Sequence, residues 1–506
     1  MAALSKATLM SAGPTDNIGS PPASPVEWMD FLYGKLGSRL LTYKRYGDYY
    51  DGSHKNMAFA QDKYRSAYAE LFKTWNDNFC GLIVDSVNER LSIEGFRFGD
   101  EAVADTEAQE IWQRNFMDSE ANSAHLDSMI NGSSYAIVWA DDKGKATITV
   151  ESAERVVVQY KPGSRRDIEA AAKFYLDDWG RSWVTLWLED GVYTGSPKLG
   201  GYQLDSAEEN PLGVVPVVPI HNRARLVGEP LSDLHTVIPI ADAINKTVAD
   251  ALIASEYAAW PQRYVTGLEI QEDDQGNPVE PFKVAVDKLL QAEDPQASFG
   301  QFEAADLSNY CDLVNMLVQH LATVSRIPFH YFLLNGGQAP SGEAITSAEA
   351  GLISKTRERM VHFGEAWERV MRLCFQVEGN AEKAEAFDAE VMWRDPENRT
   401  EAQHIDALLK LKMIDVPKQQ LWLDAGYTSA QIANFQGLLE KQAKTEMDMA
   451  NKYMTNQEKA LMTAPAAPGQ AQKPGRNDPA AKAASKAPQG NAGNAARKSK
   501  PPANAK

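Results

Sequence analysis

Apolar residues recur at helical spacing through much of the chain, and the longest such pattern lies directly after a glycine-rich loop. Successive members of one stripe are separated by seven, three, four, three and four residues, and they are Ile353, Met360, Phe363, Trp367, Val370 and Cys374. The opposite face is charged and carries Lys355, Arg357, Glu358, Glu365, Glu368, Arg369 and Arg372. This spacing predicts one long amphipathic helix over residues 343–378, which needs partners along its whole apolar side.

Two more long helices are predicted before it, over residues 231–262 and 304–327. Pro239 either kinks the first helix or marks its true start, because proline is strongly unfavourable inside a helix. Pro328 ends the second helix. The insert between them, residues 263–303, is short, acidic and rich in turn residues. The pattern therefore indicates a stalk of two helices with a small tip.

The N-terminal part changes from a helical period to an alternating one near Ser134. Helices are predicted from residue 26, over 66–91 and over 105–130, with an aromatic-rich turn at 43–54. A β-hairpin is predicted on either side of the Asp141–Gly144 turn, since apolar residues alternate in both arms. Further strands are predicted at 155–160, 173–177, 182–188 and 191–194. Three prolines in 210–220 restrict that segment to an edge strand or an extended connector. Residues 26–230 are thus expected to form an α+β module with a largely antiparallel sheet.

After the long helix, residues 386–393 are predicted to form a single strand that returns to this sheet, and three helices follow at 400–412, 417–424 and 429–461. Residues 1–25 and most of 455–506 have the composition of disordered tails. No apolar run is long enough for a transmembrane helix, and the N-terminus does not read as a secretory signal. The whole chain is expected to be α+β and predominantly helical.

Charge is distributed unevenly along the chain. The net charge is −18, but residues 464–506 contribute +7, which leaves −25 on the rest. A body this acidic argues against tight sequence-independent binding of nucleic acid, which depends on Lys and Arg. It is compatible with a surface past which DNA slides, and equally with acidity that only keeps the protein soluble.

No residues are expected to hold a cofactor, a metal or a catalytic step. The signatures of nucleotide-binding loops, serine hydrolases and zinc proteases are absent from the sequence. The run Asp273-Asp274-Gln275-Gly276-Asn277 reads as a hairpin turn, not a calcium loop, and His320 and His330 lack the spacing of a ligand pair. Asn335-Gly336-Gly337-Gln338 reads as a flexible loop, since a phosphate loop would need a lysine. The three cysteines, Cys80, Cys311 and Cys374, are expected to be buried thiols.

The order of motifs along residues 26–453 resembles tailed-bacteriophage portal proteins of the long-tailed siphophage class. An NPLGVVPVVPIHN connector is followed by a helix, a short insert, a helix ending in IP, a glycine-rich loop, SGEAI, a long charged helix and a strand ending in WRDP. The resemblance implies a portal fold with the family's named parts. They are the wing (26–230, with the strand segment 379–396), the stem (231–262 and 304–327), the clip (263–303), the tunnel loop (328–342), the tunnel helix (343–378) and the crown (397–454).

The resemblance also implies a function. Portal proteins form a ring, typically of twelve subunits, at one capsid vertex, and double-stranded DNA passes through it during packaging and ejection. The implied partners are further copies of the chain, the large terminase subunit, the major capsid protein, the scaffold and the head-tail adaptor, with no membrane. The implied location is the virion, after assembly in the host cytoplasm. The tunnel loop would face DNA with Leu334, Asn335, Gly336, Gly337 and Gln338, and the clip would contact terminase or adaptor with Glu272, Asp273, Asp274, Gln275 and Asn277.

The chemistry of the loop agrees with a sliding contact. Residues 329–342 contain no Lys or Arg, so they cannot build the phosphate contacts that would hold DNA in place. A ring would also explain the long apolar stripes, because repeated interfaces bury surfaces that a monomer exposes. Two alternatives remain open: a structural or scaffold-like capsid component that forms no ring and uses its basic tail to hold a partner or DNA, and an enzyme with an unrecognised site.

Overall fold

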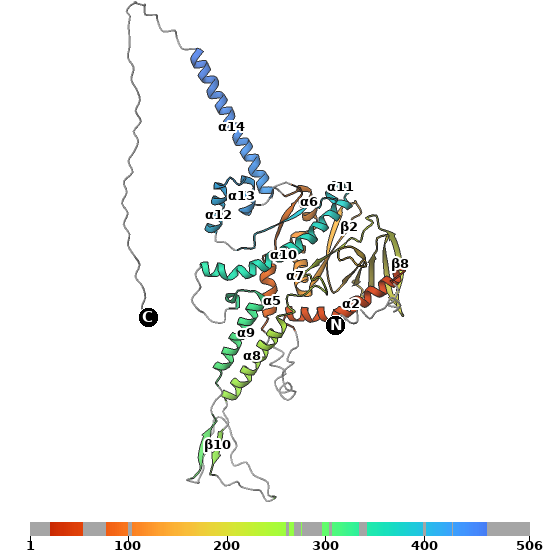
Figure 1. Cartoon of the computed structure of the whole chain (residues 1–506), viewed down its shortest axis with the longest axis vertical. Helices are drawn as coiled ribbons and strands as arrows, with labels where there is room; N and C mark the ends of the chain where they lie inside the picture. Colours follow the sequence, from red (N-terminus) through yellow and green to blue (C-terminus); the bar gives the residue numbers. More distant parts are fainter. Residues whose placement is uncertain are drawn as a thin grey trace, which may run out of the picture. The chain divides into compact units, whose positions relative to one another are not determined.

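The computed structural model describes residues 21–53, 77–99, 104–259, 263–267, 275, 296–302, 306–332, 342–397, 401–427 and 429–462 (Figure 1). The chain divides into two compact units, Met1–Phe435 and Gln436–Lys506. In the first unit, helices combine with antiparallel sheets, as predicted for an α+β protein. Most of both predicted tails, residues 1–20 and 463–506, lies outside the described residues.

The first helix, α2 (Pro25–Tyr50), starts where the sequence predicts but ends later. Ser24 caps it, since its Oγ accepts the Glu27 N–H at 3.4 Å. An aromatic turn from residue 43 was predicted, but this prediction is wrong. The helix continues because further aromatic residues extend its buried stripe, namely Tyr43, Tyr46 and Tyr49.

Three shorter helices follow, and they are α5 (Phe79–Asn88), α6 (Thr106–Arg114) and α7 (Met117–Asn131). The helix predicted over 66–91 is confirmed only for α5, because residues 54–76 lie outside the described residues. The helix predicted over 105–130 is two helices. Phe116 separates them in a left-handed conformation with φ of 55°.

Two antiparallel sheets make up the rest of the predicted wing. The three-stranded sheet has the order β3-β2-β9 and contains β2 (Ser133–Ala140), β3 (Ala146–Ser152) and β9 (Val217–His221). The five-stranded sheet runs in sequence order through β4 (Val156–Tyr160), β5 (Ile168–Leu176), β6 (Ser182–Trp187), β7 (Gly191–Lys198) and β8 (Gly201–Glu209). The predicted hairpin is confirmed as β2–β3. The strand β9, which contains Pro219, lies at an edge, as predicted for the proline-rich segment 210–220.

The strand β2 is buried on both faces and separates two cores. Ala136 and Val138 pack into a core with α5, α6, α7, α8, α9 and the long helix, while Tyr135 and Ile137 pack into a core between α2 and the five-stranded sheet. The last strand, β12 (Glu390–Trp393), pairs antiparallel with β1 (Ile93–Arg97). It therefore returns to the N-terminal module in a separate two-stranded sheet, and the predicted pairing with the larger sheet is wrong.

The two stalk helices are present as α8 (Ile238–Ala259) and α9 (Ser308–Ser325), which run side by side (Figure 1). Pro239 lies in the first turn of α8, so it marks the true start of the helix. Beyond the pair, β10 (Arg263–Thr266) and β11 (Ser298–Gln301) form a short antiparallel sheet that the sequence did not predict. Cys311 on α9 is exposed, so its prediction as a buried thiol is wrong, whereas Cys80 and Cys374 are buried.

A short 3₁₀ helix, η1 (Phe329–Phe332), follows α9, and the predicted long helix is α10 (Gly342–Val377). Its predicted apolar stripe is confirmed, since every member from Ile353 to Cys374 is buried. The remaining helices are α11 (Ala381–Ala384), α12 (Glu401–Met413), α13 (Lys418–Asp424) and α14 (Ser429–Met462). The last three agree with the predicted helices after residue 400.

Candidate functional site

The predicted DNA-facing loop begins and ends at a packed junction. Residues 333–341, which include all five predicted loop residues, lie outside the described part of the chain. Before the loop, Phe332 is buried and its ring meets that of Phe79 edge-on at 5.6 Å. After the loop, α10 begins at Gly342. The elements on either side of the predicted loop, η1 and α10, meet near the end of α9 and the segment before α8, and this junction is the candidate functional site.

A buried aspartate connects α10 to the segment that leads into α8. Asp233 lies just before α8, and its side chain is only 1% exposed. Its Oδ1 accepts hydrogen bonds from Arg359 Nη2 at 3.0 Å and from Asn222 Nδ2 at 3.0 Å, and the Lys355 ammonium lies 2.9 Å from Oδ2. Burial disfavours the charged carboxylate, but Lys355 and Arg359 outweigh it and hold the pKa of Asp233 well below its usual range. Asp233 is therefore ionised between two cations.

Lys355 also reaches the end of α9. Its ammonium donates to the Ser325 carbonyl at 3.4 Å, so one side chain joins α10 to the end of α9 and to the segment before α8. The sequence pattern placed Lys355 on the charged outer face of the long helix, but it is 7% exposed and this prediction is wrong. Arg359, one turn further on, is 2% exposed, and its Nε and Nη1 make no hydrogen bond with any residue that the structure describes. Its charge is compensated by Asp233 and by the more exposed Glu358, whose Oε1 lies 3.5 Å from Nη1.

A second buried ion pair ties η1 to α10. Arg90, just after α5, donates to the Pro396 carbonyl at 2.9 Å and to the Tyr331 hydroxyl at 2.6 Å. Its guanidinium lies 3.5 Å from the Glu349 carboxylate, and the Tyr331 hydroxyl also lies 3.5 Å from that carboxylate. The segment before the loop and the first turns of α10 are thus joined through one set of contacts.

The second half of α10 is held by aromatic packing instead. The His125 ring stacks on Phe363, with centroids 5.0 Å apart and planes 4° apart, and its Nε2 accepts the Trp367 indole N–H at 2.8 Å. Burial lowers the pKa of His125 to about 3, so the ring is neutral at physiological pH. Trp112 meets Trp367 edge-on at 5.4 Å. This cluster anchors α10 to α6 and α7.

The predicted clip contacts are largely untested by the structure. Glu272, Asp273, Asp274 and Asn277 lie outside the described residues, and Gln275 is exposed in a turn. Sequence reasoning did not find Asp233, Arg359, Arg90 or Glu349. One sequence feature could have indicated this buried cluster. Lys355 and Arg359 are one turn apart on the predicted helix, beside its apolar stripe.

In the part of the chain that the structure describes, no group of three or more His, Cys, Asp or Glu side chains could hold a metal ion. Over the same residues, none of the helices is both long and apolar enough to cross a membrane.

Comparison with known proteins identifies the family. The chain matches the model of the family described as "Phage portal protein, SPP1 Gp6-like" over residues 35–426, and it therefore belongs to the phage portal proteins. Portal proteins are structural proteins of the phage particle, and they form the ring-shaped channel through which double-stranded DNA is packaged and ejected.

Particular relatives agree with this family. The portal protein of Mycobacterium phage L5 is 30% identical over 378 residues, which are 69% of this chain and 75% of that protein. The portal protein of Mycobacterium phage D29 is 29% identical over 381 residues, which are 69% of this chain and 76% of that protein.

Two solved structures are also similar. One is described as the virion of a native gene transfer agent particle, with 12% identity and a TM-score of 0.42, and the match covers 77% of this chain and 98% of the other. The second is the neck of an empty gene transfer agent particle computed with C6 symmetry, with 10% identity and a TM-score of 0.43, covering 74% of this chain and 96% of the other.

Proposed function

We propose that twelve copies of this portal protein form the ring, and that the tunnel loop between η1 and α10 is the part nearest DNA. In this proposal α8 and α9 are the stem, residues 263–303 are the clip, α10 is the tunnel helix and residues 397–454 are the crown. The wing is the module of residues 26–230 together with β12. The loop has no Lys or Arg, which supports a contact that lets DNA slide.

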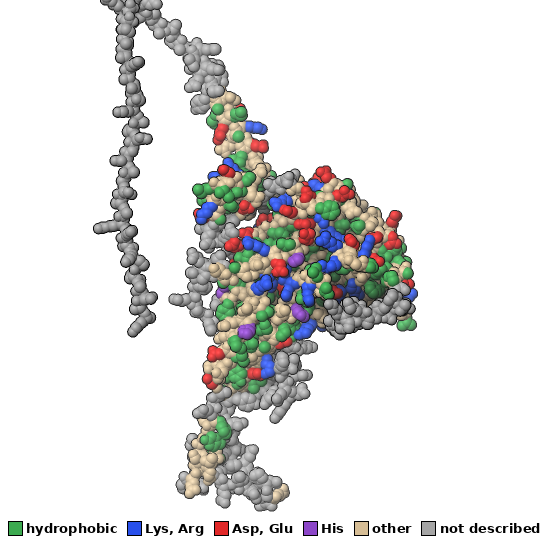
Figure 2. All heavy atoms as spheres, viewed as in Figure 1, with side chains coloured by type: hydrophobic (Ala, Val, Ile, Leu, Met, Phe, Trp, Pro, Cys, Tyr) green, Lys and Arg blue, Asp and Glu red, His purple; other side chains and the backbone are tan. Residues whose placement is uncertain are grey.

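The observation that most supports a ring is an apolar stripe on α9 that nothing in the described chain covers. Leu313, Met316 and Val324 are 41%, 47% and 47% exposed, and they follow one another at helical spacing. Figure 2 shows hydrophobic side chains on the surface of the helix pair. Such a stripe is costly in a monomer, and a neighbouring subunit in a ring would cover it.

The proposed partners follow from this arrangement. The terminase motor docks on the clip and hydrolyses ATP, and the head-tail adaptor takes its place after packaging. The major capsid protein and the scaffold contact the outside of the ring at the capsid vertex, and assembly takes place in the host cytoplasm. The portal itself guides DNA passively and later acts as a valve.

A paired substitution on α9 tests the ring. Leu313→Glu with Met316→Glu should prevent ring formation, because it places two charges in the proposed interface, while the single chain stays folded. Light scattering and negative-stain images of the purified protein give the mass and the shape. Leu199→Glu, at a fully exposed turn between β7 and β8, is the matched control and should still form rings. A wild-type protein that stays monomeric at every salt concentration would overturn the proposal.

Two further variants test the proposed roles of the tunnel loop and of the basic tail independently. Replacing Gly336 and Gly337 by alanine stiffens the loop, so rings should form but DNA packaging should fall. Normal packaging by this variant would contradict the tunnel-loop assignment.

Deleting residues 464–506 should leave rings intact, whereas a scaffold-like component that binds through its basic tail would lose its partner.

A further inference from the structure

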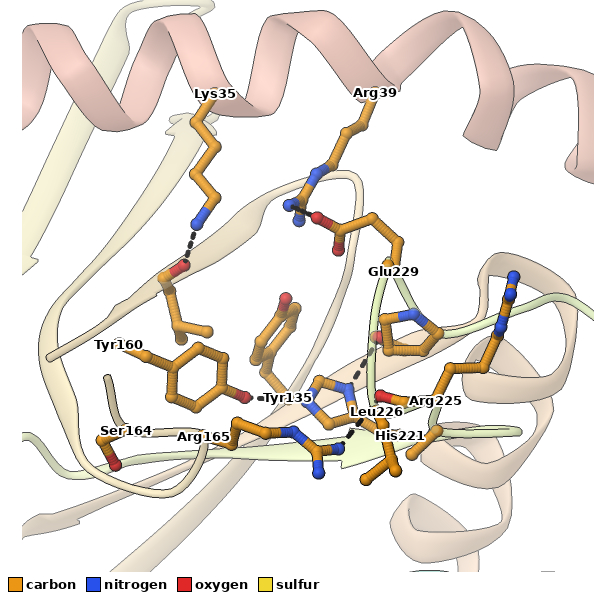
Figure 3. A pocket seen from close by; sticks show the side chains of 15 residues that line it. Lys35, Arg39, Tyr135, Tyr160, Ser164, Arg165, His221, Arg225, Leu226 and Glu229 are labelled. Atoms are coloured by element: carbon orange, nitrogen blue, oxygen red, sulfur yellow. Dashed lines mark hydrogen bonds and ion pairs between the residues drawn. The ribbon is translucent and has the colours of Figure 1, made fainter. Parts of the chain in front are cut away.

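A polar cavity of about 230 Å³ lies where α2, the turn between β4 and β5, and the segment after β9 meet (Figure 3). Three cationic side chains face it, and they are Lys35, Arg39 and Arg165, whereas Arg225 lines it with its side chain pointing away (Figure 3). Glu229 is the carboxylate among the lining residues. The cavity is therefore strongly positive within a body whose net charge is −25.

The one carboxylate among the lining residues, Glu229, already has a cationic partner. Glu229 forms an ion pair with Arg39. Lys35 instead donates to neutral oxygens, the Val158 carbonyl at 2.9 Å and the Gln159 amide oxygen at 2.8 Å. Burial and the nearby Arg39 lower the pKa of Lys35 to about 8, against the opposite effect of Glu229. The ammonium is thus only partly compensated inside the protein.

Arg165 is also without a carboxylate partner among the described residues. Its Nη2 donates to the backbone carbonyl of Arg225 at 3.0 Å, which leaves the positive charge of the guanidinium unneutralised. A guanidinium held by a neutral acceptor keeps further donors for an anion, because it carries five N–H groups in a fixed plane.

Neutral donors complete the lining. The Tyr135 side chain is 2% exposed and lines the cavity, yet its hydroxyl makes no hydrogen bond with another described residue. The hydroxyl opens onto the cavity, so it is available to donate a hydrogen bond to a ligand or to water there. Beside it, His221 is held between Ser133 Oγ at 2.9 Å and the Tyr160 hydroxyl at 2.8 Å. Burial lowers the pKa of His221 to about 4, so the ring is neutral and contributes no charge.

We propose that this cavity binds the phosphate group of a small ligand, either inorganic phosphate or a phosphate monoester such as a mononucleotide. Its donors converge from three elements on one recess, and a tetrahedral oxyanion accepts several charge-assisted hydrogen bonds at once. The acidic body repels a DNA duplex, which favours a small free ligand over duplex phosphates. A bound phosphate joins α2 to residues 223–229, only a few residues before Asp233 and the start of α8.

Isothermal titration calorimetry of the full-length protein with inorganic phosphate at constant ionic strength tests the site. Titrations with adenosine monophosphate, acetate and a short DNA duplex show which kind of ligand the cavity prefers. Phosphate and the monophosphate should bind more tightly than acetate. Tyr135→Phe should lower phosphate affinity about tenfold through one lost hydrogen bond to a charged group, and Arg165→Ala should lower it by more. Arg166→Ala is the matched control. Arg166 has the same charge, is exposed like Arg165 and is adjacent in sequence, but it does not line the cavity, so its effect should be small.

The Tyr135→Phe variant keeps the test decisive, because it removes a hydroxyl that has no described partner and should not reduce the stability of the unliganded protein. Phosphate should also raise the melting temperature of the wild type, and by less in this variant. Absence of phosphate binding by the wild type would overturn the proposal, as would binding of the duplex alone. Phosphate binding that is unchanged in both Tyr135→Phe and Arg165→Ala would show that the site lies elsewhere, and would overturn it too.

Discussion

The two halves of α10 are held to their neighbours by different forces. Residues 347–359 meet η1, the end of α9 and the segment before α8 through the buried charged side chains of Glu349, Lys355 and Arg359, beside the buried apolar Leu352 and Ile353. Residues 360–377 pack on α6 and α7 mainly through apolar and aromatic side chains, with Phe363 and Trp367 fully buried. The half next to the predicted loop is therefore the half that contains the buried ion pairs.

The difference matters because the two kinds of contact respond differently to mutation. An apolar core loses stability in proportion to the volume removed, and it relaxes partly around the change. A buried ion pair gives little net stability when intact, but removing one partner leaves an uncompensated charge that no relaxation neutralises. We therefore expect the loop end of α10 to be sensitive to single charge changes and its far end to be sensitive to changes of volume.

The largest effect is expected for Asp233→Asn. This change leaves Lys355 and Arg359 buried without their carboxylate, and breaking such a pair costs about 3 to 5 kcal/mol. Urea unfolding of the purified protein measures the loss. Asp406→Asn on α12 is the matched control, since Asp406 pairs with Lys410 at 2.7 Å and both side chains are exposed. A loss as small as that of the control would contradict the importance of the buried charges.

Lowering the pH should reduce the difference in unfolding free energy between the wild type and Asp233→Asn. The pKa of Asp233 is lowered in the folded protein, so its ionised form contributes stability above the unfolded pKa of about 4, and this contribution is lost as the pH falls towards the folded pKa. The two proteins should therefore differ fully at neutral pH and converge below pH about 4. Unfolding curves across this range measure the convergence, and a constant difference would contradict the low pKa.

A moderate effect is expected for Trp367→Phe in the apolar half. The change removes the hydrogen bond to His125 Nε2 and leaves a small cavity, which together should cost about 1 to 3 kcal/mol. This loss should not vary between pH 5 and pH 8, because His125, with a pKa lowered to about 3, stays neutral across that range. Unfolding at both pH values tests this, and a loss that changes with pH would mean that a titrating group takes part.

Local periodicity explains which elements could be predicted. The α10 stripe, the β2–β3 hairpin and the edge strand β9 each follow from residues that are neighbours in sequence. The strand β8 was missed because seven of its nine residues are exposed and it has no apolar alternation. The continuation of α2 was missed because the turn-forming residues around Gly47 are overridden by burial of the tyrosines on both sides.

The candidate site could be predicted only in part. The sequence located the loop and the helix behind it, but it did not show what holds them. Asp233 and Lys355 are far apart in the chain, and a lysine and an arginine one turn apart on a helix are most often solvated. Only the fold shows that this turn of α10 faces the end of α9 and the segment before α8 instead of solvent. Pairing of distant charges needs the tertiary structure, whereas a stripe along one helix does not.

The smallest effect is expected for Glu349→Gln, the same kind of isosteric change as Asp233→Asn and in the same half of α10. Arg90 keeps two other acceptors, the Pro396 carbonyl and the Tyr331 hydroxyl, and its distance to Glu349 is already 3.5 Å. The glutamine oxygen can still accept a hydrogen bond, so the loss should be only about 1 kcal/mol. Urea unfolding of both variants side by side compares the two pairs. Equal losses of unfolding free energy in the two variants would mean that burial of the charges alone determines the loss. A smaller loss for Glu349→Gln would mean that the other acceptors of Arg90 reduce it.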